Sequence, residues 1–154
     1  MDKAVKSDII KSGSSYGALN DKNDPLHIRR DRHAEMYYEA VRNSQKTDIV
    51  RIISKNTGMS EAAVSKVYDH VFIDEHEQYG GIRRFDSDYD MAESFRRLRE
   101  GRDIREHDLT LVRHEHLEQG LMKKFGFSYE EAHRLAERKY NYREALEAFK
   151  KGGG

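Results

Sequence analysis

Three side chains in the last third of the chain are of types that transfer protons or bind metal ions: His114, Glu118 and His133. Imidazole titrates near neutral pH and can accept or donate a proton, and a carboxylate can orient it or coordinate a cation. His114 and Glu118 stand four residues apart in "HEHLE", which is about one turn of a helix. Whether all three act together depends on how two neighbouring helices face each other.

A helical wheel of the segment from about 109 to 124 places His114 and Glu118 inside its apolar arc. The arc is formed by Leu111, Leu121 and Met122. Glu115 lies at its edge. A histidine and a carboxylate one turn apart are therefore expected to face inward.

His133 lies on the apolar arc of the next helical segment, from about 129 to 148. The connection "KKFGFS" is short, so the two segments are expected to form an antiparallel hairpin. Pairing residues outward from the turn sets Glu118 opposite His133, with His114 one turn deeper. The sequence thus predicts that the three side chains meet.

Three interpretations fit this cluster. In the first, Glu118 and His133 form a semi-buried ion pair that fixes helix register without any catalytic role. In the second, Glu118 orients one imidazole as a general base and the other imidazole donates a proton. In the third, His114, Glu118 and His133 bind a divalent metal such as zinc with an open position. "HEHLE" lacks the second His of the zincin motif, so we rank metal binding below acid–base chemistry.

Other residues are candidates for the same site or for its surroundings. His33 lies on the apolar side of its helix and His70 at the edge of its helix face, and either of these, or Glu115, could join the cluster. His76 and His107 are expected on the surface or in loops. The strings "HIRRDRH" and "IRRF" could bind phosphate if they converge, through Arg30, Arg83 and Arg84.

Helical periodicity predicts the elements that must position these residues. The expected helices cover 31–43, 48–55, a segment capped by Ser60, a segment from Asp88 to Gly101, 109–124 and 129–148. "DEHEQYGGIRRF" holds a Gly-Gly turn and could contribute a short hairpin or an extended piece. We therefore predict an all-α, single compact domain of about six helices with a C-terminal antiparallel helical hairpin. Its expected boundaries are an irregular arm (1–28), the helical domain (29–150) and a linker or tag remnant (151–154).

The string "IISKNTGMSEAAVSKVYDHV" fits a helix-turn-helix with Gly58 at the tight turn. In a DNA reader the second helix carries several side chains for bases or phosphates. Here Lys66 is offset by Glu61 and Asp69, so the second helix is close to neutral. A helical corner built for packing alone is the favoured interpretation.

Composition narrows the class of protein. The 154 residues contain 28 basic and 28 acidic side chains, so no overall field attracts nucleic acid, which would need a local basic patch. Cysteine is absent, which excludes disulfides, thiolate zinc sites and thiol nucleophiles. No apolar run reaches the length of a membrane span, so we expect a soluble protein without a membrane partner.

Several segments together resemble a known domain: "SGSSYGALNDKNDP", "RHAEMYYEAVRN", "ISKNTGMS", "RFDSDYDMAESFRRLREG" and "LVRHEHLEQGLMKK". From about residue 12 to 142 the chain is similar to the C-terminal domain of bacterial phage minor head proteins of the MuF type and of related polymorphic-toxin effectors. The resemblance implies a toxin or effector, with nuclease the commonest activity. It also implies a location in the bacterial cytoplasm or with a phage, and a cognate immunity protein or phage structural protein as partner. It assigns no active-site residue.

The expected function is therefore that of an effector hydrolase acting on nucleic acid, with a metal-free ribonuclease as the simplest form. His114 and His133 would act as base and acid, and Glu118 would orient them. Phosphate would be held by Arg30, Arg83 and Arg84. No cofactor is needed in this scheme, although a divalent metal remains the third interpretation. The alternative is a non-catalytic module, either a helix-turn-helix nucleic-acid reader or a phage structural partner.

Overall fold

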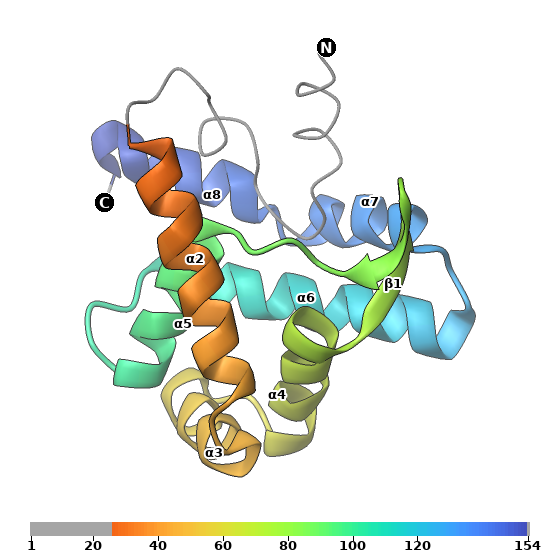
Figure 1. Cartoon of the computed structure of the whole chain (residues 1–154), viewed down its shortest axis with the longest axis horizontal. Helices are drawn as coiled ribbons and strands as arrows, with labels where there is room; N and C mark the ends of the chain where they lie inside the picture. Colours follow the sequence, from red (N-terminus) through yellow and green to blue (C-terminus); the bar gives the residue numbers. More distant parts are fainter. Residues whose placement is uncertain (1–25, 154) are drawn as a thin grey trace.

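The structure is a computed structural model that describes residues 26–153 (Figure 1). In that range it is mainly helical, with one two-stranded hairpin. The α-helices are α2 (His27–Arg42), α3 (Lys46–Thr57), α4 (Glu61–Tyr68), α5 (Tyr89–Glu100), α6 (Glu106–Phe125), α7 (Tyr129–Lys139) and α8 (Tyr142–Ala148). The other elements are the π-helical turns η2 (Asp69–Ile73) and η3 (Phe149–Gly153) and the strands β1 (Glu75–Gln78) and β2 (Gly81–Arg84). The predicted all-α class is confirmed, and of the two forms expected for the segment with the Gly-Gly turn the structure shows the short hairpin.

Local signals in the sequence fix where many of the helices begin and end. The first turns of α4, α5 and α7 are capped by the side chains of Ser60, Asp88 and Ser128. Helices α3 and α6 end at Gly58 and Gly126, whose φ angles of 81° and 72° are left-handed. A side chain with a Cβ is strained in that conformation, which explains why glycine closes both helices.

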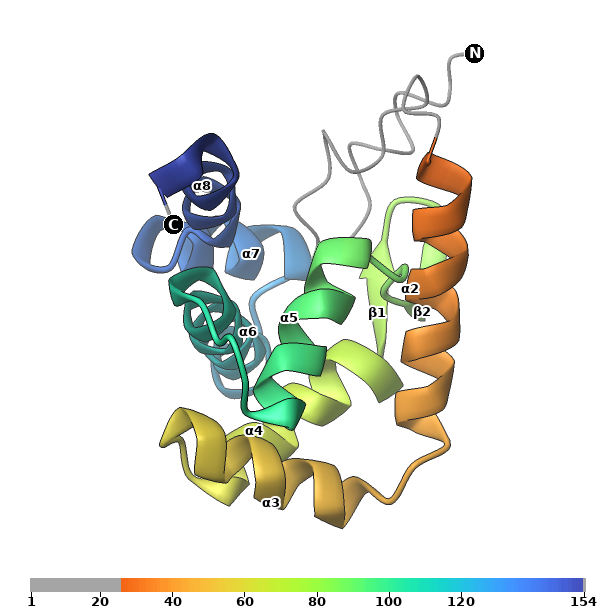
Figure 2. The same cartoon turned by 90° about the vertical axis from the view of Figure 1, so that its left-hand side faces the viewer.

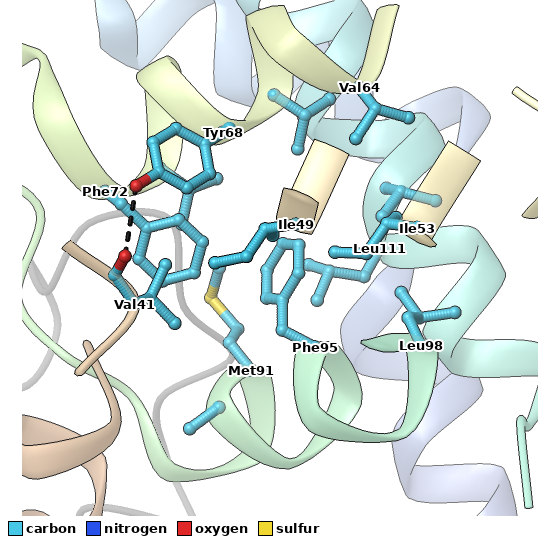
Figure 3. Close-up of a cluster of buried hydrophobic side chains, with 14 of the residues drawn as sticks. Val41, Ile49, Ile53, Val64, Tyr68, Phe72, Met91, Phe95, Leu98 and Leu111 are labelled. Atoms are coloured by element: carbon cyan, nitrogen blue, oxygen red, sulfur yellow. Dashed lines mark hydrogen bonds between the residues drawn. The ribbon is translucent and has the colours of Figure 1, made fainter. Parts of the chain in front are cut away.

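The hydrophobic core lies between α2, α3, α4 and α5 and one side of α6 (Figure 3). At its centre the Phe72 ring contacts the rings of Tyr38 at 5.0 Å and Phe95 at 5.2 Å. The Tyr68 hydroxyl donates a hydrogen bond to the Val41 carbonyl oxygen at 3.1 Å. This bond joins the end of α4 to the end of α2, so the π-helical turn that follows α4 starts from a fixed point.

Helix α6 runs through the middle of the molecule, as Figures 1 and 2 show. It packs against α7 and α8 on one side and against α4 and α5 on the other. Helix α7 returns along α6 after the short turn 126–128, so the predicted antiparallel hairpin is confirmed. Side chains of the elements on both sides can therefore contact side chains of α6.

The segment predicted as one helix over 129–148 is broken in the structure. Helix α7 ends at Lys139, and Tyr140 has an extended backbone with φ −129° and ψ 93°. Asn141 then caps α8, because its side-chain oxygen accepts the backbone N–H of Glu144. Helical periodicity continues through the break, which is why the wheel did not reveal it.

The predicted domain boundaries also shift. Helix α2 begins at His27, so residues 27 and 28 belong to a helix and not to the expected arm. Residues 1–25 of that arm lie outside the described residues. At the other end η3 includes residues 151–153, which were expected to be a linker. Within the described range, no helix has the length and apolar character needed to cross a membrane.

Candidate metal centre

Glu118, on α6, lies at the centre of a buried cluster of histidines and carboxylates. Its Oε2 atom lies 2.8 Å from Nδ1 of His133 and 3.2 Å from Nε2 of His114. Its Oε1 atom lies 2.7 Å from Nε2 of His70. The Glu118 side chain is fully buried. The predicted meeting of His114, Glu118 and His133 is therefore confirmed, and His70 joins them.

The break between α7 and α8 orients His114. A continuous helix would bond the Tyr140 carbonyl to the N–H of Glu144. Asn141 takes that N–H at 2.9 Å, and the Tyr140 carbonyl oxygen lies instead 3.0 Å from Nδ1 of His114. A carbonyl oxygen only accepts, so Nδ1 carries a proton and donates it. The other ring nitrogen, Nε2, faces Glu118.

His133 is oriented in the same way by a carboxylate on its own helix. Its Nε2 atom lies 3.3 Å from Oε1 of Glu137, one turn further along α7. Because the carboxylate accepts, Nε2 is the donor, and Nδ1 is the nitrogen that faces Glu118. Paired outer acceptors of this kind are usual around metal-binding histidines, where they fix the tautomer and ring direction.

Three polar atoms thus converge on one point in the buried hairpin. Nε2 of His114 and Nδ1 of His133 lie 3.3 Å apart, and both face Oε2 of Glu118. With the outer nitrogens protonated, neutral rings would present two lone pairs to a carboxylate oxygen. That arrangement requires a cation at the point of convergence, either a proton or a metal ion. Two imidazoles and one carboxylate are a usual ligand set for zinc.

A second group of ligand-type atoms lies on the other side of Glu118. It consists of His70, Glu115 and Glu118, all buried, with Nε2 of His70 also 3.7 Å from Oε1 of Glu115. His70 enters this group because it lies in the π-helical turn η2, where the backbone bond runs from Asp74 N–H to the Asp69 carbonyl. Both groups could hold a metal ion.

The charges of the cluster depend on its burial. Burial raises the pKa of Glu118, but hydrogen bonds from His114, His133 and His70 outweigh it and hold that pKa well below its usual range. Burial lowers the pKa of His133, but hydrogen bonds to Glu118 and Glu137 outweigh it and raise that pKa to about 10. In the absence of metal the cation at the convergence point is therefore a proton on His133. Metal binding would displace that proton, so metal affinity should rise with pH.

One edge of the cluster reaches the surface. The His133 side chain is 22% exposed, while those of His114 and Glu118 are 4% and 0% exposed. His133 lies in the wall of a surface hollow of about 580 Å³. The other lining residues all come from the segment 128–141: Ser128, Glu130, Glu131, Arg134, Glu137, Arg138 and Asn141.

The other predicted site residues lie elsewhere. His33 does not join the cluster: it is on α2, 48% exposed, and its Nε2 lies 2.7 Å from Glu93. The guanidinium of Arg30 lies over the Tyr89 ring at 5.9 Å. That end of α2 is far from the β-hairpin that carries Arg83 and Arg84, so Figure 1 gives no support for a shared phosphate site.

Two histidines expected on the surface are buried. His76 is 4% exposed, because β1 folds back over η2. Its Nε2 donates a hydrogen bond to the His70 carbonyl oxygen at 2.9 Å, and its ring stacks on the Phe85 ring. His107 is 2% exposed, because α6 starts three residues earlier than predicted and buries its first turn. Its Nε2 lies 3.2 Å from a guanidinium nitrogen of Arg97.

A basic surface that the sequence did not reveal is formed mainly by residues of α4, α6 and α7. It is a hollow of about 300 Å³ whose lining includes no carboxylate within the described range. Its basic residues are Lys66, Arg113, His116, Lys124 and Lys139. Phe125 and Tyr140 also line it. The spacing of Arg113, His116 and Lys124 along one face of α6 was the available signal, although Lys66 and Lys139 join only through packing.

Comparisons with known proteins add no assignment. No protein-family model matches the chain, and searches of curated proteins and of solved structures returned no significant match. The chemistry of the cluster is therefore the basis on which a function can be argued.

Proposed function

We propose that the protein is a metal-dependent hydrolase in which His114, Glu118 and His133 bind one divalent ion, with zinc the favoured ion. The observation that carries the proposal is the convergence of two imidazole nitrogens and one carboxylate oxygen beneath a surface hollow. Both imidazoles have their outer nitrogens occupied, by the Tyr140 carbonyl and by Glu137. These two contacts support metal binding over a purely structural ion pair. An ion pair between Glu118 and His133 does not require the rings of both His114 and His133 to be held in a fixed orientation.

The geometry favours metal chemistry over metal-free acid–base catalysis. A general acid must bring a protonated nitrogen within reach of the substrate. His114 is buried, and both of its nitrogens have partners inside the protein. His133 alone has an exposed edge, and one imidazole does not provide the acid and base pair of a two-histidine ribonuclease. A bound ion would supply the missing function, because it polarises the scissile group and acidifies a bound water.

Nucleic acid is the proposed substrate class. The support is the basic hollow beside the hairpin, where Lys66, Arg113 and Lys124 are exposed and have no ion-pair partner among residues 26–153. Cationic side chains without internal partners bind the phosphates of nucleic acids. Exposed Phe125 offers a surface on which a base can stack. The resemblance to phage head and toxin domains is in keeping with a nuclease effector.

The experiment compares metal content and hydrolysis in one set of variants. Protein stripped with a chelator is dialysed against zinc, manganese or magnesium and assayed on single-stranded RNA and DNA. We expect His133→Ala to lose bound metal and hydrolysis together. His33→Ala removes an exposed histidine outside the cluster and should keep both. Hydrolysis that survives removal of all metal, or metal binding unchanged in His133→Ala, would contradict the proposal.

A second candidate function is nucleic-acid binding without hydrolysis, and the basic hollow favours it. Lys66 belongs to the second helix of the helix-turn-helix corner, so the corner contributes to a surface that could hold phosphates. Here the metal would only stabilise the hairpin. Binding of labelled single-stranded RNA that is weakened by Arg113→Gln but unchanged in His133→Ala, with no cleavage under any metal, would select this function.

A further inference from the structure

We propose that Glu118 bridges two metal ions, the second of which is bound by His70, Glu115 and Glu118. This rests on the proposed function, since it adds a second position beside the ion held by His114 and His133. The two ligand groups share one residue, and that residue is Glu118. A carboxylate that offers one oxygen to each of two ions is the usual centre of a two-metal site, in which the ions lie about 4 Å apart.

The two oxygens of Glu118 serve different partners. Oε2 faces His114 and His133, whereas Oε1 faces His70 at 2.7 Å. The first set comes from α6 and α7 and the second from α6 and η2, which pack on different sides of α6. The two oxygens thus face two different sets of ligand atoms, as a bridging role requires.

Glu115 provides the independent observation. Its side chain is fully buried, and neither carboxylate oxygen has a hydrogen-bond partner within the described part of the chain. Buried carboxylates are almost always paired or bound to a metal, because an unpaired charge is costly away from water. Oε1 of Glu115 lies 3.7 Å from Nε2 of His70, an ion-pair contact that is too long for a hydrogen bond, so this oxygen is aimed at the second ligand group. A cation there would satisfy it.

Aromatic packing holds His70 so that Nε2 faces the carboxylates. The His76 ring lies edge-on at 4.6 Å and the Phe85 ring at 5.2 Å with an interplanar angle of 84°. The His76 side chain also donates to the His70 backbone carbonyl. His76 and Phe85 therefore hold an imidazole whose nitrogen Nε2 lies near both Glu115 and Glu118.

The donor sets of the two positions differ. The first offers two imidazole nitrogens and one carboxylate oxygen, and the second offers one nitrogen and two carboxylates. Imidazole-rich sites suit zinc, while carboxylate-rich sites suit manganese or magnesium. We infer a zinc-preferring outer position near His133 and an oxygen-rich inner position for a harder divalent ion.

Metal stoichiometry tests the bridge directly. Stripped protein is saturated with manganese, desalted and measured by mass spectrometry and by electron paramagnetic resonance. The expected result is two ions per chain with a weakened, spin-coupled signal. Glu115→Gln, which keeps the side-chain shape, should retain one ion and show the six-line signal of an isolated manganese. Glu61→Gln, an exposed carboxylate on α4, is the matched control and should retain two ions.

The possible results separate the two proposals. One ion per chain in the wild type, unchanged by Glu115→Gln, overturns the bridge and leaves the proposed function standing. No bound ion in any protein, with zinc or manganese, overturns both. His70→Gln is a second test of the same position and should match Glu115→Gln, with circular dichroism to confirm that each variant is folded. Two uncoupled ions that persist in both variants would place the second ion elsewhere and also overturn the bridge.

Discussion

In two histidines of the cluster, His114 and His133, both ring nitrogens have partners and the two nitrogens have separate roles. In His114 and His133 the outer nitrogen donates to a fixed oxygen, and the inner nitrogen faces Glu118. The oxygen that accepts from the outer nitrogen sets the tautomer of each ring, and the tautomer decides whether the inner nitrogen can bind a metal. Glu137 and the Tyr140 carbonyl are therefore positioning groups for the proposed metal.

Replacing Glu137 by Gln should weaken metal binding without removing a ligand. The change takes away the charge that accepts the Nε2 proton of His133, and loss of such a partner reduces metal affinity by about 10- to 100-fold. Zinc affinity measured by competition with a chromophoric chelator checks this. Glu130→Gln changes an exposed carboxylate of the same helix and should leave the affinity unchanged. Equal affinities in both variants would show that Glu137 does not position His133.

His107 should make the protein sensitive to mild acid. Burial lowers its pKa from 6.5 to about 4; the positive charges of Arg97, Arg105 and Lys150 add to this shift and the carboxylate of Asp108 opposes it. Between pH 6.5 and about 4, His107 binds a proton in the unfolded chain but not in the folded chain. The contribution of His107 to the free energy of unfolding is therefore complete above pH 6.5 and is lost as the pH decreases through 4. The full contribution of this one group is on the order of 3 kcal/mol.

A substitution isolates that contribution from those of the carboxylates. In His107→Gln the amide oxygen can still accept from Arg97, but the side chain does not titrate. Denaturant unfolding at pH 7.0 and pH 4.5 should show a smaller loss of stability in the variant than in the wild type. The same loss in both proteins would mean that His107 is not held neutral.

Among the elements, turns and helix breaks decide which side chains meet. The corner between α3 and α4 depends on Gly58, and the Ser54 hydroxyl there donates to the Met59 carbonyl at 2.6 Å. The break at Tyr140 frees the carbonyl that orients His114. The π-helical turn η2 brings His70 to Glu118. Departures from regular α-helix occur on both sides of the cluster, and π-helical turns are often found at functional sites.

Gly58→Val should destabilise the domain by about 1–3 kcal/mol, because a β-branched residue is strained at a φ of 81°. No atom lies within 4 Å of the added Cβ, so the cost comes from the backbone and not from a clash. Thermal and denaturant unfolding measure the difference. Gly58→Asn should cost less, since asparagine tolerates the left-handed region. A valine variant as stable as the asparagine variant would contradict this account of the turn.

At the scale of the whole molecule, the cluster ties together parts that are distant in the sequence. Its ligands come from η2, α6 and α7, and both η2 and α7 pack against α6. A metal that binds the folded chain and not the unfolded chain would strengthen all of these contacts together.

Metal removal should therefore lower global stability. At a free zinc concentration about 100 times Kd, binding should add about 2.7 kcal/mol to the free energy of unfolding. Melting curves with zinc and with excess chelator would show this as a shift in Tm. The shift should be smaller in His133→Ala, which lacks one ligand, and unchanged in His33→Ala. A wild-type Tm that is the same in zinc and in chelator would count against a metal centre.

The sequence by itself determined the helical class and the meeting of His114, Glu118 and His133. Both follow from short-range rules: the helical period sets the direction of each side chain, and a short connection forces α7 back along α6. The caps at Ser60 and Ser128 were equally readable, because a cap involves residues within one turn.

Only the tertiary structure decided the rest of the site. His70 reaches Glu118 across 48 positions of sequence, through a π-helical turn that no periodic pattern announces. Glu115, at the edge of the apolar arc, is fully buried because α6 is covered on several sides, which a wheel of one helix cannot show. The basic residues Lys66 and Lys139 join Arg113 only after α4 and α7 pack on α6. The physical reason is the same in each case: long-range packing decides which faces of a helix are covered, and local sequence does not encode it.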